Sequence, residues 1–143
     1  MYSTIICAID LSDESHRVVE LAIVQAHGET ERIHLVHACE HPITGYGEST
    51  GRNHQVTECQ IRQEVYPRLK TIAEQHQIEH DNIHIPFGKP ADAIHALCTE
   101  LEGDLIVVGS HGHSGLRLLL GSTANSVIHG ASCDVLTVRI RQD

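Results

Sequence analysis

The sequence predicts one α/β domain built on a doubly wound, five-stranded parallel sheet. Two observations predict this class: five short apolar runs are separated by segments with helical spacing, and most of those runs are apolar throughout instead of alternating with polar residues. Unbroken apolar runs are typical of parallel strands buried on both faces, and strands that alternate with helices favour right-handed crossovers and helices on both faces. With 143 residues, we expect residues 1–143 to form a single domain.

The five strands are expected where the apolar runs end in polar residues or glycine. The run with the strongest apolar character is the fourth, which leads directly into a glycine-rich turn. The predicted strands are Thr4–Ile9, Ile33–Ala38, Ile83–Phe87, Leu105–Val108 and Asp134–Ile140.

Four helices are expected between the strands. Ser12 is a plausible N-cap for the first, which should end near Gly28. The second pattern runs from about residue 55 to 76 and contains Pro67, which predicts a kink or two short helices. Pro90 suits the first position of the third helix, and the fourth should open at Ser122.

Composition excludes several classes of function. The formal charge of −9 repels nucleic-acid phosphates, so no nucleic-acid partner is expected. No apolar run approaches the roughly 20 residues that span a bilayer, and the N-terminus has no basic segment typical of a signal peptide. The five cysteines are odd in number and form no CxxC motif, which favours reduced thiols and a cytoplasmic protein without membrane contact.

A ligand is expected where the first and fourth strands end. In doubly wound sheets the ligand lies beyond the carboxyl ends of the strands, where the strand order reverses. There, Asp10 would face the turn Gly109–Thr123, whose glycines let the backbone approach a phosphate. Ser122 and Thr123 would add the N–H groups of a helix N-terminus, and Asp10 could hold ribose hydroxyls or a phosphate-bound Mg²⁺.

Other interpretations of these residues stay open. The glycines could merely shape a strand–turn–helix connection, since neither GxGxxG nor the GK[ST] of a P-loop is present. His111 and His113 could contact phosphate or solvent, but no HxxxH or CxxC supplies a ligand set, so no metal site is expected. No GxSxG elbow and no suitably placed lysine occur, so no catalytic residue is assigned and hydrolysis would be slow at most.

Several motifs resemble the universal stress proteins. The family carries Gly-x-x-Gly, about nine residues, and then Gly-Ser/Thr after its fourth strand; here these are Gly109-Ser-His-Gly112 and Gly121-Ser122. The resemblance covers nearly the whole chain, through IICAIDLSDES, LVHA, Gly88-x-Pro90, DLIVVGSHG, LLLGSTANSVIH and CDVLTVRI.

The resemblance implies a flavodoxin- or Rossmann-like sandwich of the adenine nucleotide alpha hydrolase type that binds ATP, with or without Mg²⁺. Asp10 would meet the ribose or phosphates, Ala8 and Ile9 would line the base and ribose, and Ala38 would offer backbone groups to adenine. Val108 would pack near the ribose, and the phosphates would be surrounded by Gly109, Gly112, Gly121, Ser122 and Thr123.

The family also implies a homodimer, paired through the last strand at Val135–Ile140, that acts as a stress-response regulator with an unknown protein partner. The alternatives are a nucleotide-independent dimeric interaction protein of the family's non-ATP-binding branch, or a weak ATPase. One departure bears on the site: eight residues separate Gly112 and Gly121, one fewer than in the ATP-binding pattern, which shifts where His113–Arg117 point.

Overall fold

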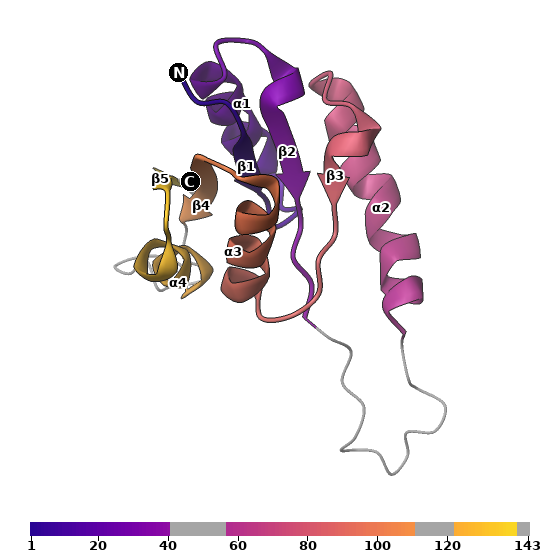
Figure 1. The fold of residues 1–143 in the computed structure, drawn as a ribbon. Helices are drawn as coiled ribbons and strands as arrows, with labels where there is room; N and C mark the ends of the chain where they lie inside the picture. Colours follow the sequence, from indigo (N-terminus) through magenta and orange to yellow (C-terminus); the bar gives the residue numbers. More distant parts are fainter. Residues whose placement is uncertain (41–56, 111–121, 140–143) are drawn as a thin grey trace.

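The computed structural model describes residues 1–40, 57–110 and 122–139. In these ranges five parallel strands form one sheet in the order β3-β2-β1-β4-β5, with helices on both faces (Figure 1). This is the predicted doubly wound, Rossmann-like fold. The elements are β1 Ile5–Ala8, α1 Ser15–Gln25, η1 Thr30–Arg32, β2 Ile33–Val36, α2 Glu58–Gln75, η3 His80–Asn82, β3 Ile83–His84, α3 Pro90–Leu101, β4 Leu105–Ser110, α4 Ser122–Gly130 and β5 Asp134–Arg139.

The strands fall where the apolar runs predict, with two changes of length. β3 ends at His84 instead of Phe87, because Pro86 has no N–H to continue a ladder, although an isolated bridge still joins Cys39 to Phe87. β4 continues two residues past Val108 to Ser110, because it pairs with β5 as far as Arg139. Ile140 lies outside the described residues.

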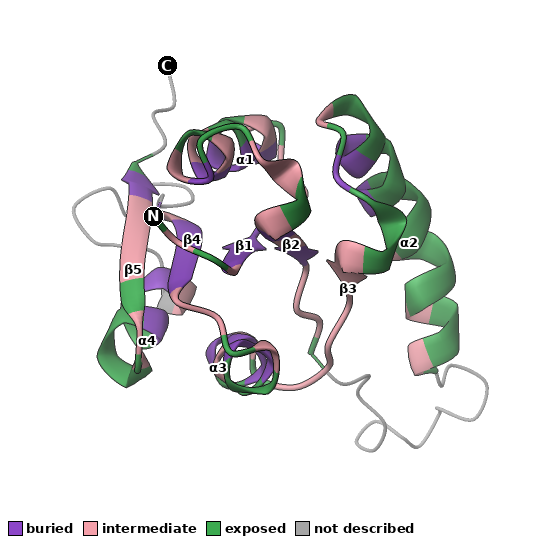
Figure 2. Ribbon diagram, turned by 45° about the horizontal axis from the view of Figure 1, so that its top comes forward, coloured by how far each residue is buried: buried purple, intermediate pink, exposed green. Residues whose placement is uncertain are grey.

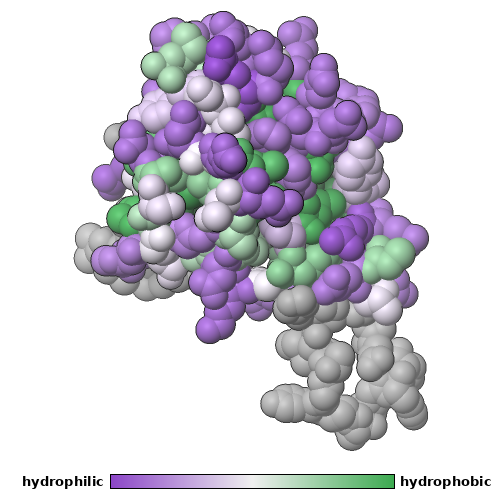
Figure 3. All heavy atoms as spheres, viewed as in Figure 1, coloured by the Kyte–Doolittle hydropathy of each residue, from purple (hydrophilic) through white to green (hydrophobic). Residues whose placement is uncertain are grey.

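Alternate residues of the strands fill two separate cores, one on each face of the sheet. In Figure 2 the buried strands β1, β2 and β4 lie between α1 on one face and α3 on the other. Ile5, Cys7 and Ile9 pack with α1 and α2, whereas Ile6 and Ala8 pack with α3 and α4. The outer helix faces are exposed, and polar residues dominate the visible surface in Figure 3. The unbroken apolar runs are explained by this two-sided burial.

One helix prediction is wrong, and a second is narrowed to one of its two alternatives. Ser12 does not cap α1: Glu14 precedes its first residue and gives no side-chain cap, and Ser12 instead closes a turn in which its carbonyl accepts the Ser15 N–H at 3.0 Å. The 55–76 pattern forms one helix, α2, with Pro67 inside it, and not two helices. A capping box of Thr57 and Gln60 secures its first turn.

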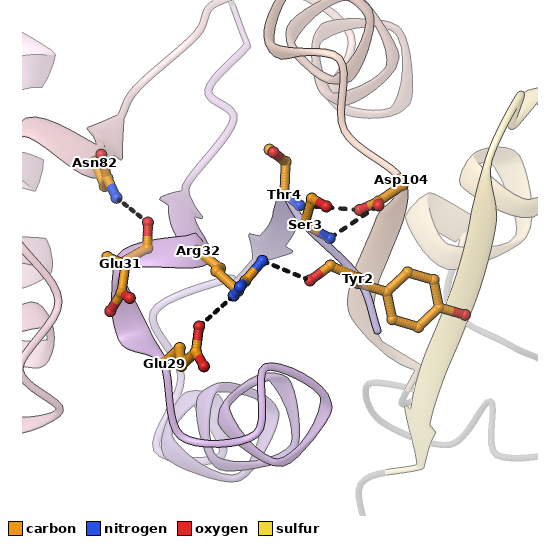
Figure 4. Close-up of polar contacts among 8 residues, drawn as sticks. All are labelled: Tyr2, Ser3, Thr4, Glu29, Glu31, Arg32, Asn82 and Asp104. Carbon is orange, nitrogen blue, oxygen red and sulfur yellow. Dashed lines mark hydrogen bonds and ion pairs between the residues drawn. The ribbon is translucent and has the colours of Figure 1, made fainter.

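The amino ends of the strands are tied together by polar contacts (Figure 4). The Asp104 carboxylate accepts the N–H groups of Ser3 and Thr4 at 2.9 and 3.0 Å. Arg32 pairs with Glu29 at 2.6 Å and donates to the Tyr2 carbonyl at 3.4 Å. Because these groups satisfy one another, the amino edge of the sheet is a structural joint.

Candidate functional site

The strand order reverses at β1, which lies between β2 and β4. Ala8 pairs with Val36 on one side and with Val108 on the other. The chain proceeds from β1 to β2 and β3 in one direction, and from β4 to β5 in the other. The carboxyl ends of β1 and β4 therefore form the switch point at which doubly wound folds bind ligands, as the sequence predicts.

The apolar residues predicted to line the site are largely buried in the two cores. Ala8 and Val108 are 6% and 4% exposed on the α3 and α4 side, and Ile9 is 7% exposed on the α1 and α2 side. Ala38 and Gly109 are half-buried. A ligand at this edge would therefore meet backbone atoms and the tips of these side chains more than broad apolar surfaces.

Asp10 follows β1 and is oriented by the turn after it. Its Oδ1 accepts the Ser12 N–H at 2.9 Å and the Ser15 hydroxyl at 3.4 Å. The intervening Leu11 adopts a left-handed φ of 66°, which is unfavourable for a branched residue. The Leu11 carbonyl accepts Arg68 Nη2 at 3.1 Å, so α2 also holds this turn.

Ser12 leaves a polar atom without a partner beside this carboxylate. Its Oγ is out of contact with solvent and has no hydrogen-bond partner in the structure as described. Burying a hydroxyl without a partner costs about 1–3 kcal/mol, and such atoms are rare in folded proteins. Because no solvent reaches this oxygen, a ligand could hydrogen-bond to it only after the atoms around it move.

His37 is a residue at this edge that has no assigned role in the sequence prediction. Its Nδ1 lies 2.9 Å from the Ile9 carbonyl, which can only accept, so Nδ1 carries the proton. The Ile9 N–H in turn donates to the Val36 carbonyl at 2.9 Å. These bonds continue the contact between β1 and β2 past the last paired residues and stiffen the edge.

The helix α4 begins at Ser122, as predicted. Ala124 and Val127 anchor α4 in the core against β4, and Thr123 is half-buried in its first turn. The N-terminus of α4 follows β4, so its N–H groups lie toward the same edge as Asp10. Gly112, Gly121, His111 and His113 lie outside the described residues.

The described residues hold no metal cluster, and the cysteine near the carboxyl edge is not activated. In ranges 1–40, 57–110 and 122–139, no three His, Cys, Asp or Glu side chains converge as a metal site. Cys39 lies near the edge, but burial raises the pKa of its thiol and outweighs the opposing charge of Arg62, so it is not an activated thiolate. No described helix is both long and apolar enough to cross a bilayer.

The family model of the universal stress proteins matches residues 1–139. The chain belongs to the universal stress protein family. It is 39% identical to universal stress protein A homolog 2 of Coxiella burnetii, over 98% of this chain and 97% of that protein. It is 32% identical to universal stress protein G of Salmonella typhimurium, over 97% of this chain and all of that protein.

A solved universal stress protein in complex with cAMP has the same fold. It is 26% identical to this chain, with a TM-score of 0.67 over 96% of this chain and 97% of that one. Family membership and fold thus agree with the sequence analysis, and the bound cAMP belongs to that relative.

Proposed function

We propose that this universal stress protein binds an adenine nucleotide, with ATP the physiological ligand, at the carboxyl edge of β1 and β4. The observation that carries the proposal is the Asp10 carboxylate, which the turn after β1 orients at the switch point of the sheet. A nucleotide ribose supplies the hydroxyl donors that such a carboxylate accepts.

The residues at this edge fit the parts of a nucleotide. The backbone of Ile9 and Ala38 would meet the base, Asp10 would accept from ribose hydroxyls, and Ala8 and Val108 would form the floor. The phosphates would lie along Gly109, Gly112, Gly121, Ser122 and Thr123, where the N-terminus of α4 favours negative charge. If Mg²⁺ accompanies the phosphates, Asp10 would hold it through water, where it would offset phosphate charge. The related protein solved with cAMP supports the adenine class of ligand.

The protein would act as a nucleotide-dependent regulator in the cytoplasm, a compartment that suits a chain with five free cysteines. The described contacts at the edge orient a carboxylate and hold a turn, which suits ligand binding, and the sequence has no P-loop lysine motif for phosphoryl transfer. Binding that changes a surface read by a protein partner is therefore the better-supported function than hydrolysis.

The binding test is titration calorimetry with ATP, AMP and cAMP on protein freed of ligand by unfolding and refolding. Wild-type protein should bind ATP, and Asp10→Asn should weaken binding about tenfold because one carboxylate acceptor is lost. Asp13→Asn, an exposed change of the same kind one turn away, should bind like wild type. Gly121→Val should abolish binding by crowding the phosphate turn.

The absence of ATP binding at millimolar concentration would overturn the proposal in favour of a nucleotide-independent interaction protein. Phosphate release that disappears in Asp10→Asn but persists in Asp13→Asn would instead identify a weak ATPase.

We also propose that the protein is a homodimer paired through β5. β5 is the last strand of the sheet and pairs with β4 alone in the chain as described, so its other edge would be an open template for pairing. Two copies related by a two-fold axis would close both edges at once. Sedimentation should give twice the chain mass of 15.8 kDa.

Thr137→Lys tests the dimer, because it places two positive charges near the two-fold axis. It should give a folded monomer, with Arg139→Lys as a control that stays dimeric. A monomeric wild-type protein would refute this interface.

A further inference from the structure

Two cysteines far apart in the sequence bring their sulfur atoms into contact. Cys98 lies in the last turn of α3, and Cys133 immediately precedes β5; their Sγ atoms are 3.6 Å apart. All five cysteines of the chain lie within the described ranges and are free thiols. The contact joins a helix of one face to the start of the edge strand.

The surroundings hold both thiols in place but leave one within reach of solvent. Cys98 is 4% exposed and its Sγ faces the Gly103 carbonyl at 3.5 Å, whereas Cys133 is half-buried and its Sγ faces the Asp134 carbonyl at 3.4 Å. Gly103 leaves the space that Cys98 occupies, because a Cβ on Gly103 would come within 2.9 Å of that sulfur. The pair thus combines a fixed inner thiol with a reachable outer one.

We propose that Cys98 and Cys133 are a redox site that closes to a reversible intramolecular disulfide when a hydroperoxide oxidises it. An S–S bond is about 2.04 Å long, so the sulfurs need to approach by about 1.6 Å, which small side-chain rotations supply. No other group has to be displaced from between them.

The reaction balances with one hydroperoxide for each pair. The Cys133 sulfur attacks the peroxide, the O–O bond breaks, and Cys133 becomes a sulfenic acid while the peroxide leaves as water or an alcohol. The Cys98 sulfur then attacks the Cys133 sulfur, the S–O bond breaks, and the hydroxyl departs with the Cys98 proton as a second water. The two thiols together lose two electrons, and the peroxide gains them.

The charge environment determines how fast this happens. Burial, the neighbouring Cys98 thiol, and the carboxylates of Asp134 and Asp104 raise the pKa of Cys133 to about 12. Because the thiolate is the attacking form, oxidation is slow near neutral pH and accelerates about tenfold for each pH unit gained below that pKa. Such a pair responds to sustained oxidation and not to brief exposure.

The closed disulfide would tether the segment that runs from β4 to α4, since both elements lie between residues 98 and 133. A disulfide that closes a loop of this length strongly restricts the unfolded chain. The melting temperature of the oxidised protein should therefore be about 10 °C higher.

The test is oxidation of the whole purified protein with excess hydrogen peroxide at about pH 9, where more of the Cys133 thiol is ionised than at neutral pH, followed by intact mass and non-reducing peptide mapping. We expect a loss of two hydrogen atoms, a cross-linked peptide joining Cys98 to Cys133, a higher melting temperature, and full reversal by dithiothreitol. Cys133→Ala should abolish all four changes. Cys59→Ala, which removes an exposed cysteine elsewhere, should leave them intact.

Failure to find the Cys98–Cys133 peptide in folded, peroxide-treated protein would overturn the proposal, as would an equal mass change in Cys133→Ala. If Cys98→Ser unfolds the protein by disturbing the core, Cys133→Ala at the half-buried position still decides the question.

Discussion

His34 and His84 form a hydrogen bond between neighbouring strands, with Nδ1 of the first 2.9 Å from Nε2 of the second. One ring must donate and the other accept, so at least one of them is neutral in this arrangement. A second pair, His16 and His76, joins α1 to the end of α2 with Nδ1 and Nε2 3.0 Å apart. The histidines of this chain therefore include two interelement contacts that protons can break.

These pairs predict that the protein loses stability on mild acidification. Burial and repulsion by His84 lower the pKa of His34, and burial lowers that of His84 although Glu100 opposes it. Burial and His16 likewise lower the pKa of His76, against Glu20. Because unfolded histidine titrates near 6.5, this stability is full above that pH and is lost as the pH falls through the lower folded values.

The check is urea unfolding at about pH 7.5 and about pH 5.5, on either side of the histidine range. The free energy of unfolding should fall, by on the order of 1 kcal/mol for a solvent-screened pair. His84→Gln should flatten the profile, whereas exposed His129→Gln should leave it unchanged. A profile that is flat in the wild type would contradict this prediction.

Replacing Pro67 is predicted to stabilise the folded protein. It lies exposed in the interior of α2, where it has no N–H to donate to the carbonyl four residues earlier. Pro67→Ala should restore that bond and raise the free energy of unfolding by about 1–3 kcal/mol. Thermal unfolding measures the change, with Lys70→Ala as an exposed control in the same helix; a destabilised Pro67→Ala would mean that Pro67 fixes a bend that α2 needs.

Removing the Asp104 carboxylate is predicted to destabilise the amino edge of the sheet. Burial alone would raise its pKa, but the N–H bonds from Ser3 and Thr4 outweigh burial and lower it. Asp104→Ala should lose about 1–2 kcal/mol of stability near neutral pH. Since the folded pKa is below the ordinary value, the wild-type advantage should vanish as the pH falls through it. Asp13→Ala serves as the control, and equal denaturation midpoints for the two variants would refute the assignment.

The core beside α3 is predicted to have no room for a side chain in place of Gly103. An added Cβ would lie 2.9 Å from Cys98 Sγ and 3.0 Å from Ile6 Cγ1. Gly103→Ala should destabilise the protein by about 1–3 kcal/mol through overpacking. In a Cys98→Ala background the same change should cost less, because one of the two contacts is gone. Equal costs in both backgrounds would show that the strain does not involve Cys98.

Local sequence patterns were sufficient for most of the architecture. The apolar runs located every strand, Pro90 located the start of α3, and the alternation of strands and helices gave a parallel sheet with two covered faces. Asp10 and Gly109 could be placed at one edge because carboxyl ends of parallel strands share an edge. These features depend on residues close in sequence, or on topology rules that hold for the whole class.

Tertiary structure alone decided which distant side chains meet. Nothing in the spacing of Cys98 and Cys133, or of His34 and His84, shows that they touch, because their contact depends on strand register and helix packing summed over the whole sheet. The same holds for the turn after β1. The sequence predicts Ser12 as a helix cap, but Arg68 from α2 and the Asp10 carboxylate hold a turn in which the Ser12 hydroxyl has no partner among the described residues. The sequence by itself thus determined the scaffold and the edge at which a ligand belongs. Folding decided which side chains meet at that edge. It also decided the contact between the two cysteines and the contacts within the two histidine pairs.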